Sequence, residues 1–258
     1  MALAHAEHKG GDFVSGFAKG LSVIGAFGED APRLSITDVA RRTGLDRASA
    51  RRLLLTLVQL GYATHDGKYF ELTHRILRLG QSYLSTTPLS AILQPYLERL
   101  CETGGQSCSA AVLDEAEIVY IARASRRRVM SINLGPGSRL PAYCSSMGRV
   151  LLASLPEEEV RELLKGRPLR ANTERTITDL ERLMEELLRV RSQGYALVDQ
   201  ELEMGLCSIA VPLRNRTDRI VAALNIGAPA ASVTPAQLVE QYLPMLKDVA
   251  ERARLDLR

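Results

Sequence analysis

The segment LSITDVARRTGLDRASARRLLLTLVQLGY, residues 34–62, predicts two short helices joined by a tight turn. Gly44 can adopt the left-handed backbone of such a turn, and Asp46 is a good N-cap for the second helix. Gly61 ends that second helix. Two helices that pack at a steep angle need small or apolar side chains at fixed offsets, and five residues fit this requirement: Ala40, Gly44, Leu45, Ala50 and Leu53. The segment therefore predicts a helix-turn-helix motif.

The residues on either side complete a predicted domain. Residues 62–73, YATHDGKYFELT, place Asp66-Gly67 between two runs rich in aromatic and β-branched residues. Asp-Gly predicts a hairpin with a type I′ turn, in which both central residues have positive φ. Residues 13–28 predict an amphipathic helix with four apolar residues at three- and four-residue spacing: Phe13, Phe17, Leu21 and Ile24. Residues 29–34, which contain Pro32, predict a loop. A hairpin directly after the second helix is the wing of a winged helix-turn-helix.

Positive charge is concentrated in the same part of the chain. The formal net charge is +3; residues 1–80 hold 11 Lys and Arg against 8 Asp and Glu, whereas residues 81–258 hold 22 of each. A local basic excess is typical of a protein that binds a polyanion. A solvated helix face would explain the charge alone, and a winged helix used only for protein contact is the alternative for the motif.

We expect the helix from Arg47 to about Leu60 to enter the major groove of DNA with its N-terminal residues. Arg41 and Arg42, at the end of the preceding helix, and Lys68, on the wing, are expected to contact phosphates. The complete set of candidate DNA-binding residues is Thr37, Arg41, Arg42, Asp46, Arg47, Ser49, Arg51, Arg52 and Lys68. The pattern leaves open which arginine contacts a base and which contacts a phosphate.

The rest of the chain predicts a second domain, in which strands and helices alternate. Strands are expected at residues 107–113, 117–123, 129–134, 195–198, 208–213 and 219–226, and helices at 89–104, 145–154, 157–165, 179–193 and 235–254. Antiparallel strand pairs with helices on their flanks indicate the α+β class. We divide the chain into a disordered tail (1–12), a winged helix-turn-helix DNA-binding domain (13–73), a linker helix (74–88) and an effector-binding domain (89–258).

Composition disfavours several other classes of protein. No apolar run approaches the roughly 18 residues of a membrane span, and the N-terminus lacks the apolar region of a secretory signal. The four cysteines contain no C-x-x-C pair, so we expect a cytoplasmic protein with no disulfide framework, metal or cofactor. The last histidine is His74, which leaves Cys144 without a histidine to activate it. An enzyme with a fused DNA-binding domain and an architectural protein with a purely structural second domain are the competing hypotheses.

The chain resembles the isocitrate lyase regulator (IclR) family of bacterial transcription factors from about Phe13 to Arg254. The motifs that carry the resemblance are residues 34–62, GSRLPAYCSSMGRVLLA (137–153), GYALVDQELEMGLCSIAVPL (194–213) and ALNIGAP (223–229). Residues 118–149 are most similar to the subgroup that controls aromatic acid catabolism through the β-ketoadipate pathway. That subgroup includes the protocatechuate regulators PcaR and PcaU and the 4-hydroxybenzoate regulator PobR.

The resemblance implies a GAF-like effector domain, with an antiparallel or mixed central sheet, that binds a small organic acid. Protocatechuate and 4-hydroxybenzoate are the expected acids, and an effector from another carboxylate-catabolism operon is the alternative. The resemblance also implies dimers, often paired into tetramers, on a pseudo-palindromic operator in double-stranded DNA. RNA polymerase is a further candidate partner, and the family includes both activators and repressors.

The resemblance also assigns a ligand pocket to the second domain. Its residues here are Ser145, Ser146, Met147, Gly148, Asp199, Glu201, Ser208, Asn225 and Gly227. Members that bind two- and three-carbon acids carry small residues where this chain has Ser146-Met147, and a cysteine where it has Ser208. These departures favour a ligand that is larger than glyoxylate or pyruvate, or differently polar. Asp199 and Glu201 would face the same way if their segment is extended.

An anion site is also predicted from the residues alone. Ser145 and Ser146 open a helix, and the first N–H groups of a helix are free to bind a carboxylate. Arg139 and Arg149 are close in sequence and could supply positive charge. The alternative for each residue is structural, since Ser145 could simply cap the helix and the arginines could be solvated.

Overall fold

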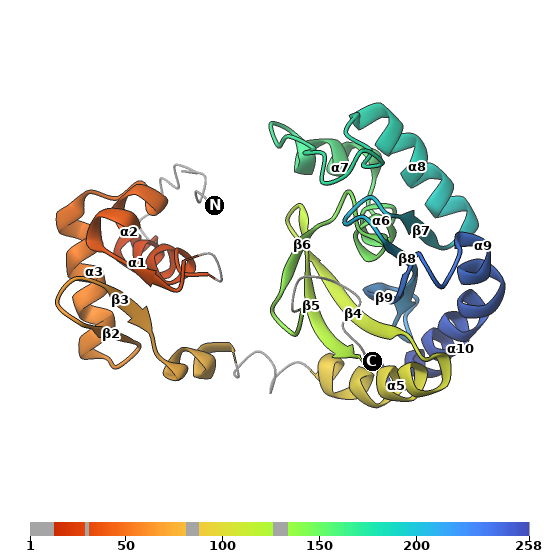
Figure 1. Cartoon of the computed structure of the whole chain (residues 1–258), viewed down its shortest axis with the longest axis horizontal. Helices are drawn as coiled ribbons and strands as arrows, with labels where there is room; N and C mark the ends of the chain where they lie inside the picture. The colour runs from red at the N-terminus through yellow and green to blue at the C-terminus, as the bar shows by residue number, and fades with distance from the viewer. Residues whose placement is uncertain (1–12, 29–30, 81–87, 126–133, 258) are drawn as a thin grey trace. The chain divides into compact units, whose positions relative to one another are not determined.

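The structure of the protein, a computed structural model, describes residues 13–28, 31–80, 88–125 and 134–257. The chain divides into two compact units, Met1–Thr86 and Thr87–Arg258, and each is considered by itself (Figure 1). The expected tail, part of the expected linker helix and most of the expected strand at 129–134 lie outside the described residues.

In its described residues, the N-terminal unit has a small antiparallel sheet and the helices α1 (Ser15–Gly25), α2 (Ile36–Thr43) and α3 (Arg47–Gln59). The sheet has the order β1-β3-β2, formed by β1 (Arg33–Leu34), β2 (Ala63–His65) and β3 (Phe70–Leu72). A short 3-10 turn, η1 (His74–Ile76), follows the sheet. The sequence predicted a loop where β1 pairs with β3, so this strand is an addition to the expected fold.

The helix-turn-helix forms as the local sequence predicts. Gly44 ends α2 with a φ of 71°, and the Asp46 carboxylate accepts a hydrogen bond of 2.8 Å from the backbone N–H of Ser49. At the start of α2, Ser35 and Asp38 form a capping box. The winged helix-turn-helix is thereby confirmed as the fold of this unit.

The turn of the wing differs from the predicted type I′ turn. His65 pairs with Phe70, which leaves four residues in the loop, and of these only Gly67 has a positive φ, 102°. The side chain of Asp66 instead accepts hydrogen bonds from the backbone N–H groups of Lys68 and Tyr69, at 2.9 and 2.7 Å. Asp66 therefore acts through its carboxylate, as in an Asx turn, rather than through a left-handed backbone.

Helix α1 directs its apolar stripe away from its own domain. Phe17 is 69% exposed and Leu21 is 49% exposed, while Val23 is fully buried. Val23 and the half-buried Ile24 pack against the core formed with α2, α3 and the sheet. The expected spacing is present, but most of the stripe faces solvent in the single chain.

The described residues of the C-terminal unit form a six-stranded antiparallel sheet. Its order is β6-β5-β4-β9-β8-β7, and its strands are β4 (Ser107–Asp114), β5 (Glu117–Ala124), β6 (Arg139–Pro141), β7 (Ala196–Asp199), β8 (Leu206–Arg214) and β9 (Ile220–Pro229). Every strand pair that the structure describes is antiparallel, which decides between the antiparallel and mixed sheets left open by the sequence.

Helices cover both faces of this sheet. One face packs against α5 (Pro88–Gly104) and α10 (Leu243–Arg254), and the other packs against α6 (Ser146–Leu152), α7 (Glu157–Leu164) and α8 (Leu180–Gln193), as Figure 1 shows. The α+β class is confirmed. The second of these faces positions the site described below.

The predicted single helix at residues 235–254 is interrupted. It consists of α9 (Pro235–Gln237), a π-helical turn η2 (Leu238–Tyr242) and α10. Pro244, in the first turn of α10, has no N–H to donate to the preceding turn. The missing α-helical hydrogen bond is consistent with the wider π turn at this point.

Candidate functional site

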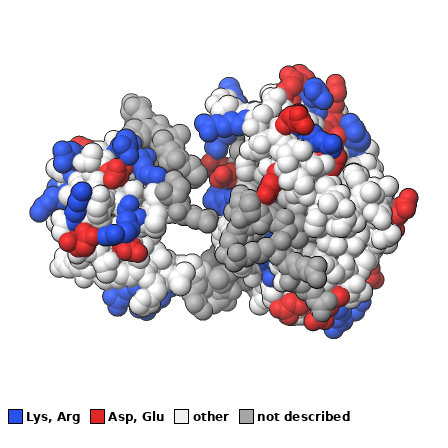
Figure 2. Space-filling view, in the orientation of Figure 1, with Lys and Arg blue, Asp and Glu red and all other residues white. Residues whose placement is uncertain are grey.

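The N-terminal unit exposes most of the candidate DNA-binding residues. Figure 2 shows several Lys and Arg side chains over the visible face of this unit. All nine candidates except Ser49, which is half-buried, are exposed. Arg47 and Arg51 lie one turn apart at the start of α3, and neither forms an ion pair within the described part of the chain. Their guanidinium groups are therefore available to a polyanion.

Some of the candidates also have structural roles. The Arg42 guanidinium donates a 3.2 Å hydrogen bond to the backbone oxygen of Ala26, which joins α2 to the end of α1. Arg41 pairs with Asp38 at 2.9 Å. Asp46 caps α3, and its hydrogen bonds from Ser49 lower the pKa of its carboxyl group below the ordinary value. A carboxylate that is kept ionised would repel a phosphate, so the capping role accounts for Asp46.

The wing adds a cation that the sequence did not single out. Arg33 of β1 and Lys68 of the loop both lie over the ring of Tyr69, at 5.4 and 5.0 Å from its centroid. The Arg33 side chain also forms an ion pair with Asp66. Sequence reasoning missed Arg33 because its segment was predicted to be a loop. Its place beside Lys68 depends on the pairing of β1 with β3.

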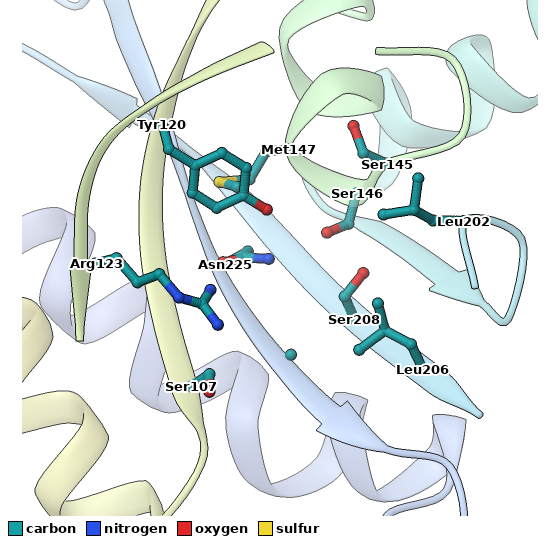
Figure 3. Close-up of a pocket in the computed structure, with 11 residues that line it drawn as sticks. Ser107, Tyr120, Arg123, Ser145, Ser146, Met147, Leu202, Leu206, Ser208 and Asn225 are labelled. Atoms are coloured by element: carbon teal, nitrogen blue, oxygen red, sulfur yellow. The ribbon is translucent and has the colours of Figure 1, made fainter. Parts of the chain in front are cut away.

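A polar pocket lies between the start of α6 and one face of the C-terminal sheet (Figure 3). Six of the nine residues predicted for the ligand pocket line it: Ser145, Ser146, Met147, Ser208, Asn225 and Gly227. Five lining residues were not predicted: Ser107, Tyr120, Arg123, Leu202 and Leu206. The cavity itself is small, about 30 Å³, within a hollow of about 440 Å³ that includes its open mouth.

Two buried polar atoms at this pocket have no hydrogen-bond partner in the described structure. They are Ser146 Oγ and Asn225 Oδ1, and the two residues are only 1% and 9% exposed. Buried polar atoms in folded proteins are nearly always paired, because an unpaired one costs about 1–3 kcal/mol. Unpaired atoms at a pocket wall are therefore the arrangement expected of a site that a polar ligand completes.

Arg123 is the only charged side chain among the described residues that line the pocket. It is half-buried, and its Nη1 donates a 2.9 Å hydrogen bond to Ser109 Oγ. No carboxylate within the described ranges lies at ion-pair distance from it. A partly buried guanidinium that faces a pocket without a counter-ion favours an anionic ligand.

A β-bulge brings Arg123 and Tyr120 to the same face of the sheet. Ala110 pairs with Ala122 but Ala111 pairs with Tyr120, so Ile121 is an extra residue on β5. Side chains of a regular strand alternate between faces, and residues three apart would point in opposite directions. Burial raises the pKa of the Tyr120 hydroxyl to about 12, so that it stays protonated and can donate a hydrogen bond.

Asp199 and Glu201 do not line the pocket, contrary to the sequence-based assignment. Strand β7 ends at Asp199, and Gln200 has a φ of 60°, so the two carboxylates do not share a face. Asp199 forms an ion pair with Arg175 and accepts a 2.8 Å hydrogen bond from Cys207 Sγ. The left-handed Gln200 thus overturns the expectation of an extended segment.

The carboxylate of Glu201 is held by Arg149 instead of facing a ligand. Arg149 Nη1 and Nη2 donate to its two oxygens at 2.7 and 2.5 Å, and the backbone N–H of Ile177 donates at 3.0 Å. Arg149 is 1% exposed. The expectation that Arg149 supplies free charge to an anion is therefore wrong. Arg139 is likewise paired, with Asp114 and Glu117.

Gly148 and Cys144 do not line the pocket. A Cβ atom on Gly148 would lie 2.2 Å from the backbone oxygen of Ala142, so glycine permits a close approach of α6 to the preceding segment. Burial raises the pKa of the Cys144 thiol to about 11, which keeps it protonated. A protonated thiol is a poor nucleophile, in agreement with the sequence-based reasoning.

Comparison with known proteins identifies the family of this chain. The IclR helix-turn-helix domain matches residues 17–67, and the C-terminal domain of the bacterial transcriptional regulator IclR matches residues 81–254. The chain belongs to the IclR family of bacterial transcriptional regulators. The matched family models and the similar proteins reported below are transcriptional regulators, so the chain is a DNA-binding transcriptional regulator with an effector domain and not an enzyme.

Two similar proteins have names that describe the genes they regulate. The Pca regulon regulatory protein of Pseudomonas putida is 45% identical over 236 residues, which cover 91% of this chain and 81% of the relative. The p-hydroxybenzoate hydroxylase transcriptional activator of Acinetobacter baylyi is 42% identical over 248 residues, covering 94% of this chain and 92% of the relative. The resemblance seen in residues 118–149 is thereby confirmed.

A solved structure is similar to the C-terminal unit. It is a double mutant of the PobR inducer-binding domain from Acinetobacter in complex with 3-hydroxybenzoic acid. Its TM-score is 0.61 at 36% identity, over 64% of this chain and 96% of that one.

Within the residues described here, no helix combines the length and apolar character needed to cross a membrane.

Proposed function

We propose that this IclR-family regulator is controlled by a hydroxylated aromatic acid, such as 4-hydroxybenzoate or protocatechuate, that binds between α6 and the sheet. The observation that carries the proposal is the polar lining: within the described part of the chain, Ser146 Oγ and Asn225 Oδ1 are buried without hydrogen-bond partners, and Arg123 beside them has no ion-pair partner. The names of the two relatives and the ligand of the PobR domain support the aromatic class.

Binding of an aromatic ring requires the lining to move. A cavity of about 30 Å³ holds roughly two water molecules, which is less than a benzoate ring needs. Flexible side chains such as Met147, Leu202 and Leu206 line it, and these can rotate outward without a change in the sheet. Such movement at α6 and the loop before β8 is the change that ligand binding would make in the effector domain.

The DNA-binding part of the proposal rests on exposed cations. Arg47 and Arg51 would enter the major groove with the start of α3, and Lys68 would contact a phosphate from the wing. Arg33, which lies beside Lys68 over Tyr69, extends the phosphate-binding surface. The operator would be a pseudo-palindrome, because a symmetric pair of α3 helices reads two half-sites.

A homodimer would account for the exposed stripe on α1. Phe17 and Leu21 place apolar surface in water, which is unfavourable unless a partner covers it. A second copy of the chain is the proposed partner, since an isologous contact covers the same stripe on both molecules at once. Ligand binding would then change the arrangement of the two α3 helices. A coupling free energy of about 1–3 kcal/mol would change operator affinity about 5- to 150-fold.

Isothermal titration of the full chain tests the ligand proposal. We expect 4-hydroxybenzoate or protocatechuate to bind saturably, pyruvate not to bind, and Ser146→Ala to weaken binding. β-Ketoadipate tests whether a pathway product replaces the aromatic acid as effector. Ser192→Ala is the matched control, because the Ser192 hydroxyl is exposed and bonds only the backbone of its own helix. Absence of binding by both aromatic acids would rule out this ligand class.

A further inference from the structure

The pocket has two chemically different regions, and a hydroxylated aromatic acid has two different polar groups. Arg123 extends from β5 on one side, while Ser146 lies on the opposite side at the start of α6 (Figure 3). Asn225 lies on β9, between these two regions. The acid can therefore be bound in either of two orientations, and the donors and acceptors of the pocket discriminate between them.

The sheet fixes the spacing between Arg123 and Asn225. Arg123 pairs with Ser109 on β4, and Ser109 pairs with Asn225 on β9, so the three residues form one row across the strands. Neighbouring strands lie about 4.8 Å apart, which places the Cα atoms of Arg123 and Asn225 roughly 10 Å from each other. The central residue, Ser109, is short, and its Oγ accepts the 2.9 Å hydrogen bond from Arg123. The guanidinium is anchored at one corner and keeps further N–H donors for a ligand.

We propose that Arg123 binds the carboxylate of the acid, and that Asn225 and Ser146 bind a hydroxyl group on the opposite side of the aromatic ring. The pocket then selects hydroxylated acids over unsubstituted ones. This inference rests on the proposed function and specifies how the effector is recognised. It also assigns a role to Arg123, a lining residue that the sequence did not single out.

The unpaired atoms determine the orientation. A carboxylate forms its strongest hydrogen bonds with a guanidinium group, and Arg123 is the only cation among the described lining residues. Asn225 Oδ1 is a buried acceptor that has no partner among the described residues, and an acceptor must be matched by a donor. An ionised carboxylate has no proton to donate, whereas a phenolic hydroxyl does. The hydroxyl is therefore the group that satisfies Asn225.

The start of α6 offers less to a carboxylate than its sequence suggested. The backbone N–H of Gly148 already bonds Ser145 Oγ at 3.3 Å, and that of Arg149 bonds the backbone oxygen of Ser145 at 2.9 Å. Helix α6 has only seven residues, so its dipole is small. Ser146 Oγ remains unpaired and can both donate to and accept from a ligand hydroxyl.

Titration with three ligands, for the wild-type chain and two substitutions, distinguishes binding of the carboxylate from binding of the hydroxyl. The ligands are 4-hydroxybenzoate, benzoate, which lacks the hydroxyl, and 4-hydroxybenzamide, which lacks the negative charge. Titration of the full chain with each ligand is repeated for Arg123→Gln and Asn225→Ala. Arg182→Gln, which removes an exposed arginine of α8, is the matched control for charge. Arg123→Lys, which keeps the charge, separates loss of charge from loss of folding.

We expect Arg123→Gln to weaken the binding of 4-hydroxybenzoate about 10- to 150-fold, and the binding of 4-hydroxybenzamide less than about 3-fold. Asn225→Ala should weaken the binding of 4-hydroxybenzoate about 2- to 12-fold and leave the binding of benzoate nearly unchanged. The wild-type chain should bind benzoate more weakly than 4-hydroxybenzoate, because benzoate leaves Asn225 Oδ1 unpaired. Arg123→Lys should retain part of the preference for the charged ligand, and Arg182→Gln should change none of these values.

The reverse pattern would overturn the assignment. If Arg123→Gln weakens the amide as strongly as the acid, Arg123 does not bind the carboxylate. If Asn225→Ala weakens benzoate as strongly as 4-hydroxybenzoate, Asn225 does not bind the hydroxyl. In both cases the wild-type chain still binds the acid, so the proposed function stands. If no aromatic acid binds the wild-type chain, the proposed function fails together with this inference.

Discussion

Arg149 and Glu201, which are 52 residues apart in the chain, form a buried bidentate ion pair that joins α6 to the segment after β7. Arg149 follows the pocket residues at the start of α6, and Glu201 precedes the pocket residue Leu202. The pair therefore joins two walls of the pocket. The carboxylate that the sequence assigned to a ligand has a protein partner in the fold.

Glu201→Gln is expected to destabilise the C-terminal unit strongly. The substitution removes the carboxylate that bonds the buried guanidinium of Arg149 directly. The remaining carboxylate, that of Glu186, lies 3.9 Å away and replaces only part of the lost charge. Loss of one partner of a buried pair costs about 3–5 kcal/mol. Urea unfolding followed by circular dichroism would measure the change in the free energy of unfolding. Glu181→Gln, at an exposed pair with Arg161, should change the free energy of unfolding far less, because solvent screens an exposed ion pair. Equal effects of the two substitutions would contradict the prediction.

Gly148→Ala is expected to disrupt the packing of α6. The added Cβ would lie 2.2 Å from the backbone oxygen of Ala142, which cannot rotate away as a side chain can. Overpacking of this kind costs about 1–3 kcal/mol or more, and the shift of α6 should also weaken effector binding. Thermal unfolding and titration with 4-hydroxybenzoate would measure both effects. Gly135→Ala is the control, because nothing lies within 4 Å of its Cβ position.

Phe17→Glu is expected to shift the protein from dimer to monomer if the α1 stripe is the dimer contact. A carboxylate in the centre of an apolar interface is desolvated without a partner, which is strongly unfavourable. Sedimentation velocity at several protein concentrations would measure the change. Ser15→Glu adds the same charge at an exposed position on another side of α1 and should have no such effect. An unchanged dimer in Phe17→Glu would place the contact elsewhere.

Lys68→Ala is expected to weaken the binding of operator DNA and of random DNA to a similar extent. A residue that binds only a phosphate contributes the same free energy at every sequence. The slope of log affinity against log salt concentration should fall in magnitude by about 1. Fluorescence anisotropy at several salt concentrations measures both quantities, and Arg182→Ala in the C-terminal unit serves as the control. A selective loss of operator binding would instead indicate contact with a base.

Asp46→Ala is expected to destabilise the N-terminal unit in a manner that depends on pH. Hydrogen bonds from the Ser49 side chain and backbone hold the pKa of Asp46 below its ordinary value of 3.8. A carboxyl group whose pKa is lowered by folding stabilises the fold above its unfolded pKa, and this stabilisation disappears as the pH falls through the folded pKa. The difference between wild type and variant should therefore be full at pH 7 and diminish below about pH 4. Urea titrations across this range would measure it. A constant difference at all pH values would show that ionisation is not involved.

The sequence by itself determined the helix-turn-helix, because its signals act within a few residues. Gly44 sets the turn and Asp46 caps α3 regardless of what packs around them, and both act as predicted. The family resemblance likewise placed Ser146 and Asn225 at the pocket, since both motifs lie in regular elements next to it.

Only the tertiary structure decided how the pocket is charged. Arg123 faces it because a bulge on β5 adds one residue and changes the alternation of side chains, which the letters EIVYIARA do not reveal. Glu201 does not line it, because Gln200 turns the chain and Arg149, from a distant segment, binds the Glu201 carboxylate. Periodicity reports on a single element, whereas the partner of a buried charge is chosen by elements that are far apart in sequence and meet only in the fold.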